Sequence, residues 1–247
     1  MRKQYQPIRE IQFAAKSGFI TKELWNEFFA YGCLAWQYRL WKQILKEKIF
    51  LCHRSRNTKD VWVLNKRHPL VFKTVGENIS NAPFISQLGH DELMAKMTLS
   101  VMRKGIASAY RLEPELKKMA PGVRQHYETG NKEKYPDGLI QLANEDRTRV
   151  ALELELTRKD LKRYRQILDT YSSYQKADLV VFILRDDRIA QTIKQAMRDT
   201  FYPKWERPIG FGRLEDWSRN PTEAKIQFSE CVTTLSDIKN RNEKIAA

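Results

Sequence analysis

Residues 149–156 read Arg149-Val150-Ala151-Leu152-Glu153-Leu154-Glu155-Leu156, an alternation of apolar and other side chains. Successive side chains of a β-strand point to opposite faces, so four apolar residues share one face: Val150, Leu152, Leu154 and Leu156. The other face carries Glu153 and Glu155, about 6–7 Å apart at two-residue spacing. Like charges this close repel each other, and a bound divalent cation is the best explanation for placing them together.

The sequence on both sides of this strand predicts an α/β domain over residues 88–220. A long helix is expected from Asp91 to about Arg111, with strands at 123–128, 138–143 and 148–156. A helix at 158–175, a buried strand at 179–184, a helix at 188–200 and an edge strand at 209–214 follow. Residues 76–87 are expected to form a linker, and residues 221–247 a loosely attached tail.

A third acid, Asp137, precedes the strand in Tyr135-Pro136-Asp137-Gly138. Residues 138–152 leave room for a strand, a turn and a returning strand, and antiparallel pairing would place Asp137 beside Glu153. Taken alone, Pro-Asp-Gly is typical of a β-turn. Glu-Leu-Glu alone fits an exposed strand face as well as it fits a metal site. Three carboxylates on neighbouring strands suit Mg²⁺ or Mn²⁺, and the combination favours a nuclease.

Residues 5–75 predict a second, N-terminal domain. Helices are expected at Ile8–Lys16, from Thr21, and at Cys33–Lys48, followed by strands at Ile49–Cys52 and Val61–Leu64. Three short helices followed by a β-hairpin are typical of a winged helix-turn-helix.

The third of these helices has two distinct faces when projected at about 100° per residue. One arc is expected in the core: Leu34, Tyr38, Leu40, Trp41, Ile44 and Leu45. The opposite arc is expected to contact DNA: Trp36, Arg39, Lys42, Gln43 and Lys46. Such side chains suit base edges and phosphates, although an ordinary solvated helix face is the alternative. The hairpin loop adds Arg54 and Arg56, placed where a wing meets the DNA backbone.

The composition agrees with a nucleic-acid partner. The 247 residues carry a net charge of +14, spread along the whole chain, and neutralising phosphates releases counterions. There is no apolar run of the length needed to span a membrane. The three cysteines, Cys33, Cys52 and Cys231, are widely spaced, which fits a reducing cytoplasm and no structural zinc site.

The motif Pro136-Asp137, with Glu153-Leu154-Glu155 on the next strand, resembles the PD-(D/E)xK nuclease superfamily, where Glu155 stands in place of the usual lysine. A winged helix followed by these motifs resembles, more narrowly, the MobC-type relaxases of mobilisable plasmids, the replication-relaxation family. The resemblance covers about residues 8–200. It implies a restriction-endonuclease-like mixed-sheet domain and nicking at a plasmid transfer origin. The implied partners are plasmid DNA and the accessory and coupling proteins of a relaxosome.

We expect metal-dependent cleavage by Asp137, Glu153 and Glu155, with the Leu154 carbonyl completing the metal shell. Glu155 serves either as a metal ligand or as general base. By resemblance, Glu92 of the long helix is a further metal ligand; the alternative is a simple helix N-terminus. Lys162 is the candidate for the relocated lysine, or else a surface cation.

Activated water, rather than a tyrosine, is expected to attack phosphorus. Tyr164 and Tyr171 lie on an apolar helix stripe, whereas Tyr135 and Tyr174 stay open as nucleophiles. The alternative function is a non-catalytic winged-helix regulator of plasmid replication or transcription.

Overall fold

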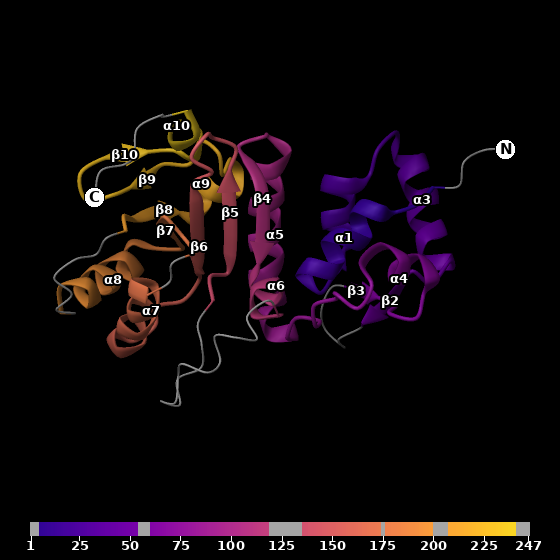
Figure 1. The fold of residues 1–247 in the computed structure, drawn as a ribbon, viewed down its shortest axis with the longest axis horizontal. Helices are drawn as coiled ribbons and strands as arrows, with labels where there is room; N and C mark the ends of the chain where they lie inside the picture. The colour runs from indigo at the N-terminus through magenta and orange to yellow at the C-terminus, as the bar shows by residue number, and fades with distance from the viewer. Residues whose placement is uncertain (1–4, 54–59, 119–134, 174–175, 200–206, 241–247) are drawn as a thin grey trace. The chain divides into compact units, whose positions relative to one another are not determined.

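The computed structural model describes residues 5–53, 60–118, 135–173, 176–199 and 207–240 (Figure 1). Packing divides the chain into two compact units, one of residues 1–92 and 114–119, the other of residues 93–113 and 120–247. Each unit is a mixture of helices and strands with its own sheet. Within the described ranges, no helix is both long enough and apolar enough to cross a membrane.

The N-terminal unit alternates helices with a small antiparallel sheet. Its helices are α1 (Ile8–Ser17), α2 (Lys22–Leu24), the π-helix η1 (Trp25–Phe29), α3 (Leu34–Lys46), α4 (Pro69–Val75) and the 3-10 helix η2 (Ile85–Gln87). The strands β1 (Ile20–Thr21), β2 (Phe50–His53) and β3 (Val61–Leu64) form a three-stranded sheet in the order β1-β3-β2. The three successive helical segments and the hairpin expected from the sequence are therefore present.

Local sequence explains where these elements begin and end. Gly18 ends α1 in a left-handed conformation, with a φ of 82°, and its N–H donates to the Ala14 carbonyl at 2.9 Å. Thr21 caps α2 because its hydroxyl accepts the Leu24 N–H at 3.2 Å. Three tryptophans fill the core: the ring centroid of Trp41 lies 5.0 Å from those of both Trp25 and Trp62.

The expected core arc of α3 is wrong for its first half. Leu40, Trp41 and Ile44 are buried, but Leu34 is 83% exposed and Tyr38 is 53% exposed. Helical projection gives the direction in which a side chain points. It does not give how much of the helix length the neighbouring elements cover, and in the described chain only the second half of α3 is covered.

The C-terminal unit is built on a seven-stranded sheet in the order β10-β9-β8-β7-β6-β5-β4. Its strands are β4 (Ala107–Leu112), β5 (Gly138–Leu142), β6 (Arg149–Glu155), β7 (Leu179–Leu184), β8 (Ile209–Arg213), β9 (Ile226–Gln227) and β10 (Val232–Thr233). The helices are α5 (Leu88–Arg103), α6 (Glu113–Lys118), α7 (Leu161–Ser173), α8 (Asp187–Asp199), α9 (Leu214–Arg219) and α10 (Leu235–Asn240). The division into units assigns the start of α5 and most of α6 to the N-terminal unit. Strands β6, β7 and β8 are parallel to one another, and the remaining pairs are antiparallel, so the sheet is mixed.

Helices pack on both faces of this sheet. A Cβ at Gly138 of β5 would lie 3.1 Å from Met94 Sδ, so α5 packs closely on that face. A Cβ at Gly212 of β8 would lie 2.2 Å from the indole nitrogen of Trp217, which shows how closely α9 approaches β8. Helices α7 and α8 contact each other and lie side by side in Figure 1. Tyr171 of α7 hydrogen bonds to Glu153 of β6, which places α7 over the acidic face of that strand.

Three expectations for this unit are wrong. Residues 107–111, expected as the end of the long helix, belong to β4, because Gly105 turns the chain with a φ of 66° and the segment pairs with β5. Strand β8 is interior rather than at the edge, since it pairs with both β7 and β9. The expected tail contributes β9, β10 and α10, with Ile226 and Leu235 fully buried. The strand expected at 123–128 lies outside the described residues.

Candidate active site

Asp137 lies where three strands come together. Strand β5 pairs with β6 so that Gly138 is opposite Leu152, which places the preceding Asp137 beside Glu153 as the sequence spacing predicts. The Asp137 side chain accepts the Leu154 N–H at 2.8 Å, and its main-chain carbonyl accepts the Glu113 N–H at 3.1 Å. The carboxylate thus replaces a ladder hydrogen bond to β6 at the point where β5 begins. Asp137 is 9% exposed, so its carboxylate is largely shielded from water and is held by this hydrogen bond to β6.

Glu153 and Glu155 share one face of β6, as alternation requires, and both are buried, at 0% and 1% exposed. The sequence alone predicted the pairing of these acids on one face. It did not predict that both acids would be buried, since a site with room for water and a phosphate was expected there. Tyr171 donates a short hydrogen bond to Glu153, so this tyrosine contacts an acid in addition to packing on the apolar stripe.

Strands β7 and β8, the next two across the sheet from β6, place aromatic rings in register with Glu153. Glu153 is opposite Phe182 of β7, which is opposite Phe211 of β8, and the two rings stack with centroids 6.0 Å apart. Tyr171 meets Phe182 edge-on at 6.5 Å, and its carbonyl accepts the Arg207 guanidinium at 2.8 Å. These contacts orient the tyrosine whose hydroxyl donates to Glu153.

Lys159 is the lysine that pairs with one of these acids, Glu155. Its ammonium donates short hydrogen bonds to both oxygens of the Glu155 carboxylate. Its main-chain N–H donates to the Tyr164 hydroxyl at 3.2 Å, and its ammonium lies 5.9 Å from the centre of the Tyr164 ring. Burial raises the pKa of Tyr164 to about 12, so this hydroxyl keeps its proton to a higher pH than an ordinary tyrosine does.

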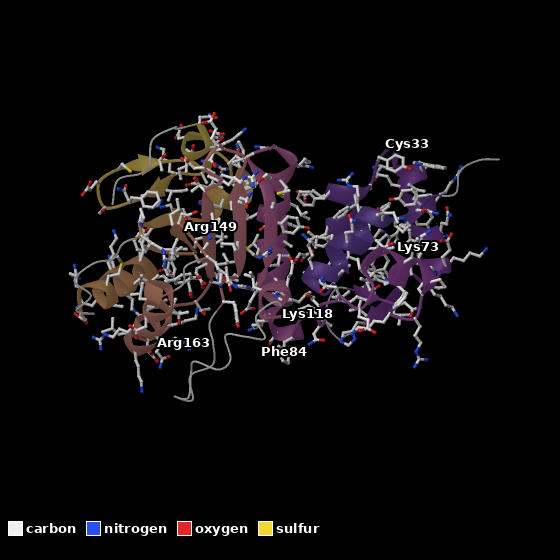
Figure 2. All side chains as sticks on the ribbon, viewed as in Figure 1. Cys33, Lys73, Phe84, Lys118, Arg149 and Arg163 are labelled. Carbon is white, nitrogen blue, oxygen red and sulfur yellow. The ribbon has the colours of Figure 1, made fainter. Side chains whose placement is uncertain are left out.

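Sequence reasoning missed Lys159 and selected Lys162, which is exposed on α7. The available signal was the four-residue spacing from Glu155. That signal was hidden because the chain between the two residues is neither strand nor continuous helix: α7 begins only at Leu161. Asp160 precedes it as the cap, with its carboxylate accepting the Arg163 N–H at 2.7 Å. Figure 2 labels Arg163 on this helix.

The donor set has the chemistry of a site for a hard cation, because carboxylate oxygens are the ligands that Mg²⁺ and Mn²⁺ prefer. In this conformation the three carboxylates accept hydrogen bonds from a backbone amide, a tyrosine hydroxyl and a lysine. Among the residues that the structure describes, no group of three or more His, Cys, Asp and Glu side chains is arranged to hold a metal ion. A cation that binds Glu155 must therefore compete with the Lys159 ammonium.

Two further candidate ligands have other contacts. Glu92 on α5 accepts a hydrogen bond from the Thr21 hydroxyl at 2.7 Å, within the N-terminal unit. Leu154 contacts Asp137 through its N–H rather than through its carbonyl. The acids that the structure brings together by strand pairing are thus Asp137, Glu153 and Glu155.

The residues expected to contact DNA lie mostly on the uncovered side of α3. Arg39, Lys42 and Lys46 are exposed, Trp36 is 44% exposed, and Gln43 is half-buried with its amide donating to Glu47 at 3.0 Å. Arg54 and Arg56 lie outside the described residues. The described part of the predicted DNA-binding set therefore forms a cationic helix face.

Comparison of the sequence with protein-family models finds no match, and comparison with curated proteins finds none either.

Proposed function

We propose that this chain is a metal-dependent DNA endonuclease that nicks one strand. The observation that carries the proposal is the hydrogen bond from the Leu154 N–H to Asp137, which ties Asp137 to the strand between Glu153 and Glu155. A β-strand that only supports a fold has no need of two buried acids next to a third. The Glu155–Lys159 pair adds the cation that the Glu-Leu-Glu sequence lacks at its third position.

In the proposed reaction, Asp137 and Glu153 would hold Mg²⁺ or Mn²⁺, and a bound ion would supply a lowered pKa for water and stabilisation of negative charge at the phosphate. Glu155 accepts the proton of the attacking water as the water oxygen bonds to phosphorus, one ester P–O bond of the strand breaks, and the leaving oxygen takes a proton from solvent. Lys159 positions Glu155, and its ammonium is available to a phosphate oxygen when the pair separates. Tyr171 orients Glu153 through its hydroxyl. Because this hydroxyl is engaged as a donor to Glu153, water rather than Tyr171 is the proposed nucleophile.

DNA binding is proposed for the N-terminal unit, read as a winged helix-turn-helix. Three helical segments precede the β2–β3 hairpin, and α3 presents Arg39, Lys42 and Lys46 to solvent without any acidic residue of its own. The resemblance to PD-(D/E)xK nucleases and to MobC-type relaxases extends this proposal to nicking at a plasmid transfer origin within a relaxosome.

A nicking assay on supercoiled plasmid tests the proposal, with Mg²⁺, with Mn²⁺ and with EDTA. Asp137→Asn and Glu153→Gln should each abolish relaxation of the supercoil while DNA affinity is unchanged or raised, since each removes a negative charge. Asp146→Asn is the matched control, because Asp146 is an exposed acid in the turn before β6. Wild-type nicking rates in the Asp137 or Glu153 variant would refute the assignment of the site.

A non-catalytic DNA-binding regulator is the second candidate. The observation in its favour is that Glu153 and Glu155 are buried beneath α7 and hydrogen bonded to Tyr171 and Lys159. Sequence-specific binding without nicking under any metal condition would establish this alternative instead.

A further inference from the structure

The N-terminal half of α3 exposes large aromatic rings. Tyr31, just before the helix, is 52% exposed, Trp36 is 44% exposed and Tyr38 is 53% exposed. Figure 2 labels Cys33, which is exposed and immediately precedes this helix. Three large aromatic side chains exposed on so short a segment, beside the cations described below, make this a candidate binding surface.

The Trp36 ring is held in place by the turn before the helix. Gly32 has a φ of 78°, and a Cβ there would lie 2.9 Å from Trp36 Cδ1, so the indole packs directly against the glycine. The Gln37 side chain donates to the Gly32 carbonyl at 3.0 Å and fixes the turn to the helix. The ring is therefore positioned before any ligand arrives, which reduces the entropy lost on binding.

Cations accompany the rings. The Lys42 ammonium lies 4.6 Å from the centre of the Tyr38 ring, over one of its two faces. This ammonium also holds the pKa of Tyr38 below its usual value of 10. Arg39 and Lys46 are exposed on the same helix, and residues 34–46 contain no aspartate or glutamate.

Three kinds of partner can be compared by chemistry. A second copy of the chain packed face to face would bring the same cations together, which is repulsive. Duplex DNA offers only base edges in its grooves, because its base faces are stacked on one another. Unpaired bases expose flat faces that stack on aromatic rings, and their phosphates attract the neighbouring cations.

We propose that the exposed side of α3 binds single-stranded DNA, with unpaired bases stacking on Tyr38 and Trp36 at its two margins and with Arg39, Lys42 and Lys46, which lie between them in helical projection, holding phosphates. The inference rests on the proposed function only in taking DNA as the partner; it does not require that the protein cleaves DNA. It assigns to this helix a preference for unpaired DNA, such as the strand opened beside a nick.

The experiment uses the full chain and measures fluorescence anisotropy of a labelled oligothymidine and of a labelled duplex of the same length, in EDTA. Tyr38→Leu and Trp36→Leu keep apolar bulk but lose the flat ring. Each should weaken binding of the single strand by about tenfold, near the effect of one stacked base, and binding of the duplex by less than about twofold. Tyr38→Phe keeps the ring and should bind like the wild type. Phe72→Leu is the matched control, because Phe72 is a 61% exposed ring on α4 of the same unit.

Unchanged single-strand affinity in both leucine variants would overturn the inference, as would an equal loss for duplex, which indicates groove reading. Loss of a concentration-dependent dimer in the variants, with unchanged DNA affinity, would assign the surface to self-association and also overturn it. Because no cleavage occurs in EDTA, failure of Asp137→Asn to abolish nicking would refute the proposed function without changing this result.

Discussion

At the scale of single residues, the candidate site depends on charge pairing in a buried environment. Glu155 is 1% exposed, and Lys159 compensates its charge from a side chain that is 36% exposed. A buried carboxylate that loses its cation keeps the full cost of desolvation. Lys159 is thus a structural residue whether or not the site is catalytic.

Lys159→Met should lower the free energy of unfolding by about 2–3 kcal/mol, the cost of leaving Glu155 without its charged partner. Lys162→Met should change it by less than about 0.5 kcal/mol, because Lys162 is exposed on the adjacent helix. Urea denaturation followed by circular dichroism measures both values. Equal stability of the two variants would show that the Lys159–Glu155 contact contributes nothing to stability.

Tyr164 links the site to stability at high pH. Burial raises its folded pKa to about 12, against a usual value of 10, with the Lys159 N–H acting in the opposite direction. A raised folded pKa contributes stability that is fully present below pH 10 and is lost as the pH rises towards 12.

Between pH 10 and 12, the free energy of unfolding of the wild type should therefore fall more steeply than that of Tyr164→Phe. Below pH 10 the difference between the two proteins should stay constant, which serves as the internal control. Parallel curves across the whole range would contradict the assignment of this titration to Tyr164. Denaturant titrations at a series of pH values supply the measurement.

At the scale of elements, glycines in β8 set the distance at which neighbours pack. A Cβ at Gly210 would lie 2.4 Å from Ile226, and one at Gly212 would lie 2.2 Å from the indole of Trp217, which is itself fully buried. The close approach of α9 and β9 to this strand is therefore possible only because these two positions have no side chain.

Gly212→Ala should destabilise the protein by about 1–3 kcal/mol, since Trp217 has to move out of a packed position. Gly89→Ala is the control, because Gly89 lies in the first turn of α5 and a Cβ added there has no neighbour within 4 Å. Alanine there should be neutral or stabilise by about 0.5 kcal/mol. A thermal melt of each variant decides the matter, and a neutral Gly212→Ala would show that α9 is not tightly packed on β8.

At the scale of the whole molecule, the net charge of +14 is the dominant electrostatic feature. A protein that neutralises phosphates releases their counterions, so the logarithm of DNA affinity falls linearly with the logarithm of salt concentration. The slope counts phosphate contacts without regard to base sequence.

Affinity for random duplex should therefore fall steeply with added salt. The double variant Arg39→Ala, Lys42→Ala should reduce the slope by about 1–2, because each phosphate contact contributes about 0.9 on duplex. Affinity for a specific site should decrease more than affinity for random DNA if these side chains also read bases. Affinity that does not depend on salt would show that the charge serves solubility alone.

The sequence by itself determined the features that depend on local periodicity and on charge. The alternation from Arg149 to Glu155 predicted β6 and the shared face of its two glutamates, and the spacing from Asp137 predicted the neighbouring acid. Gly18 and Thr21 predicted helix boundaries, because their backbone and hydrogen-bonding preferences act over a few residues.

Only the tertiary structure decided the features that depend on distant partners. Residues 107–112 are a strand because β5 pairs with them, and Ile226 and Leu235 are buried within the seven-stranded unit. Leu34 and Tyr38 are exposed because no described element covers the first half of α3. Tyr171 meets Glu153 because α7 packs across β6, and Lys159 meets Glu155 because the chain turns into that helix. Periodicity gives the direction of each side chain from its own backbone, whereas burial and partnership are fixed by which surfaces the whole fold brings together.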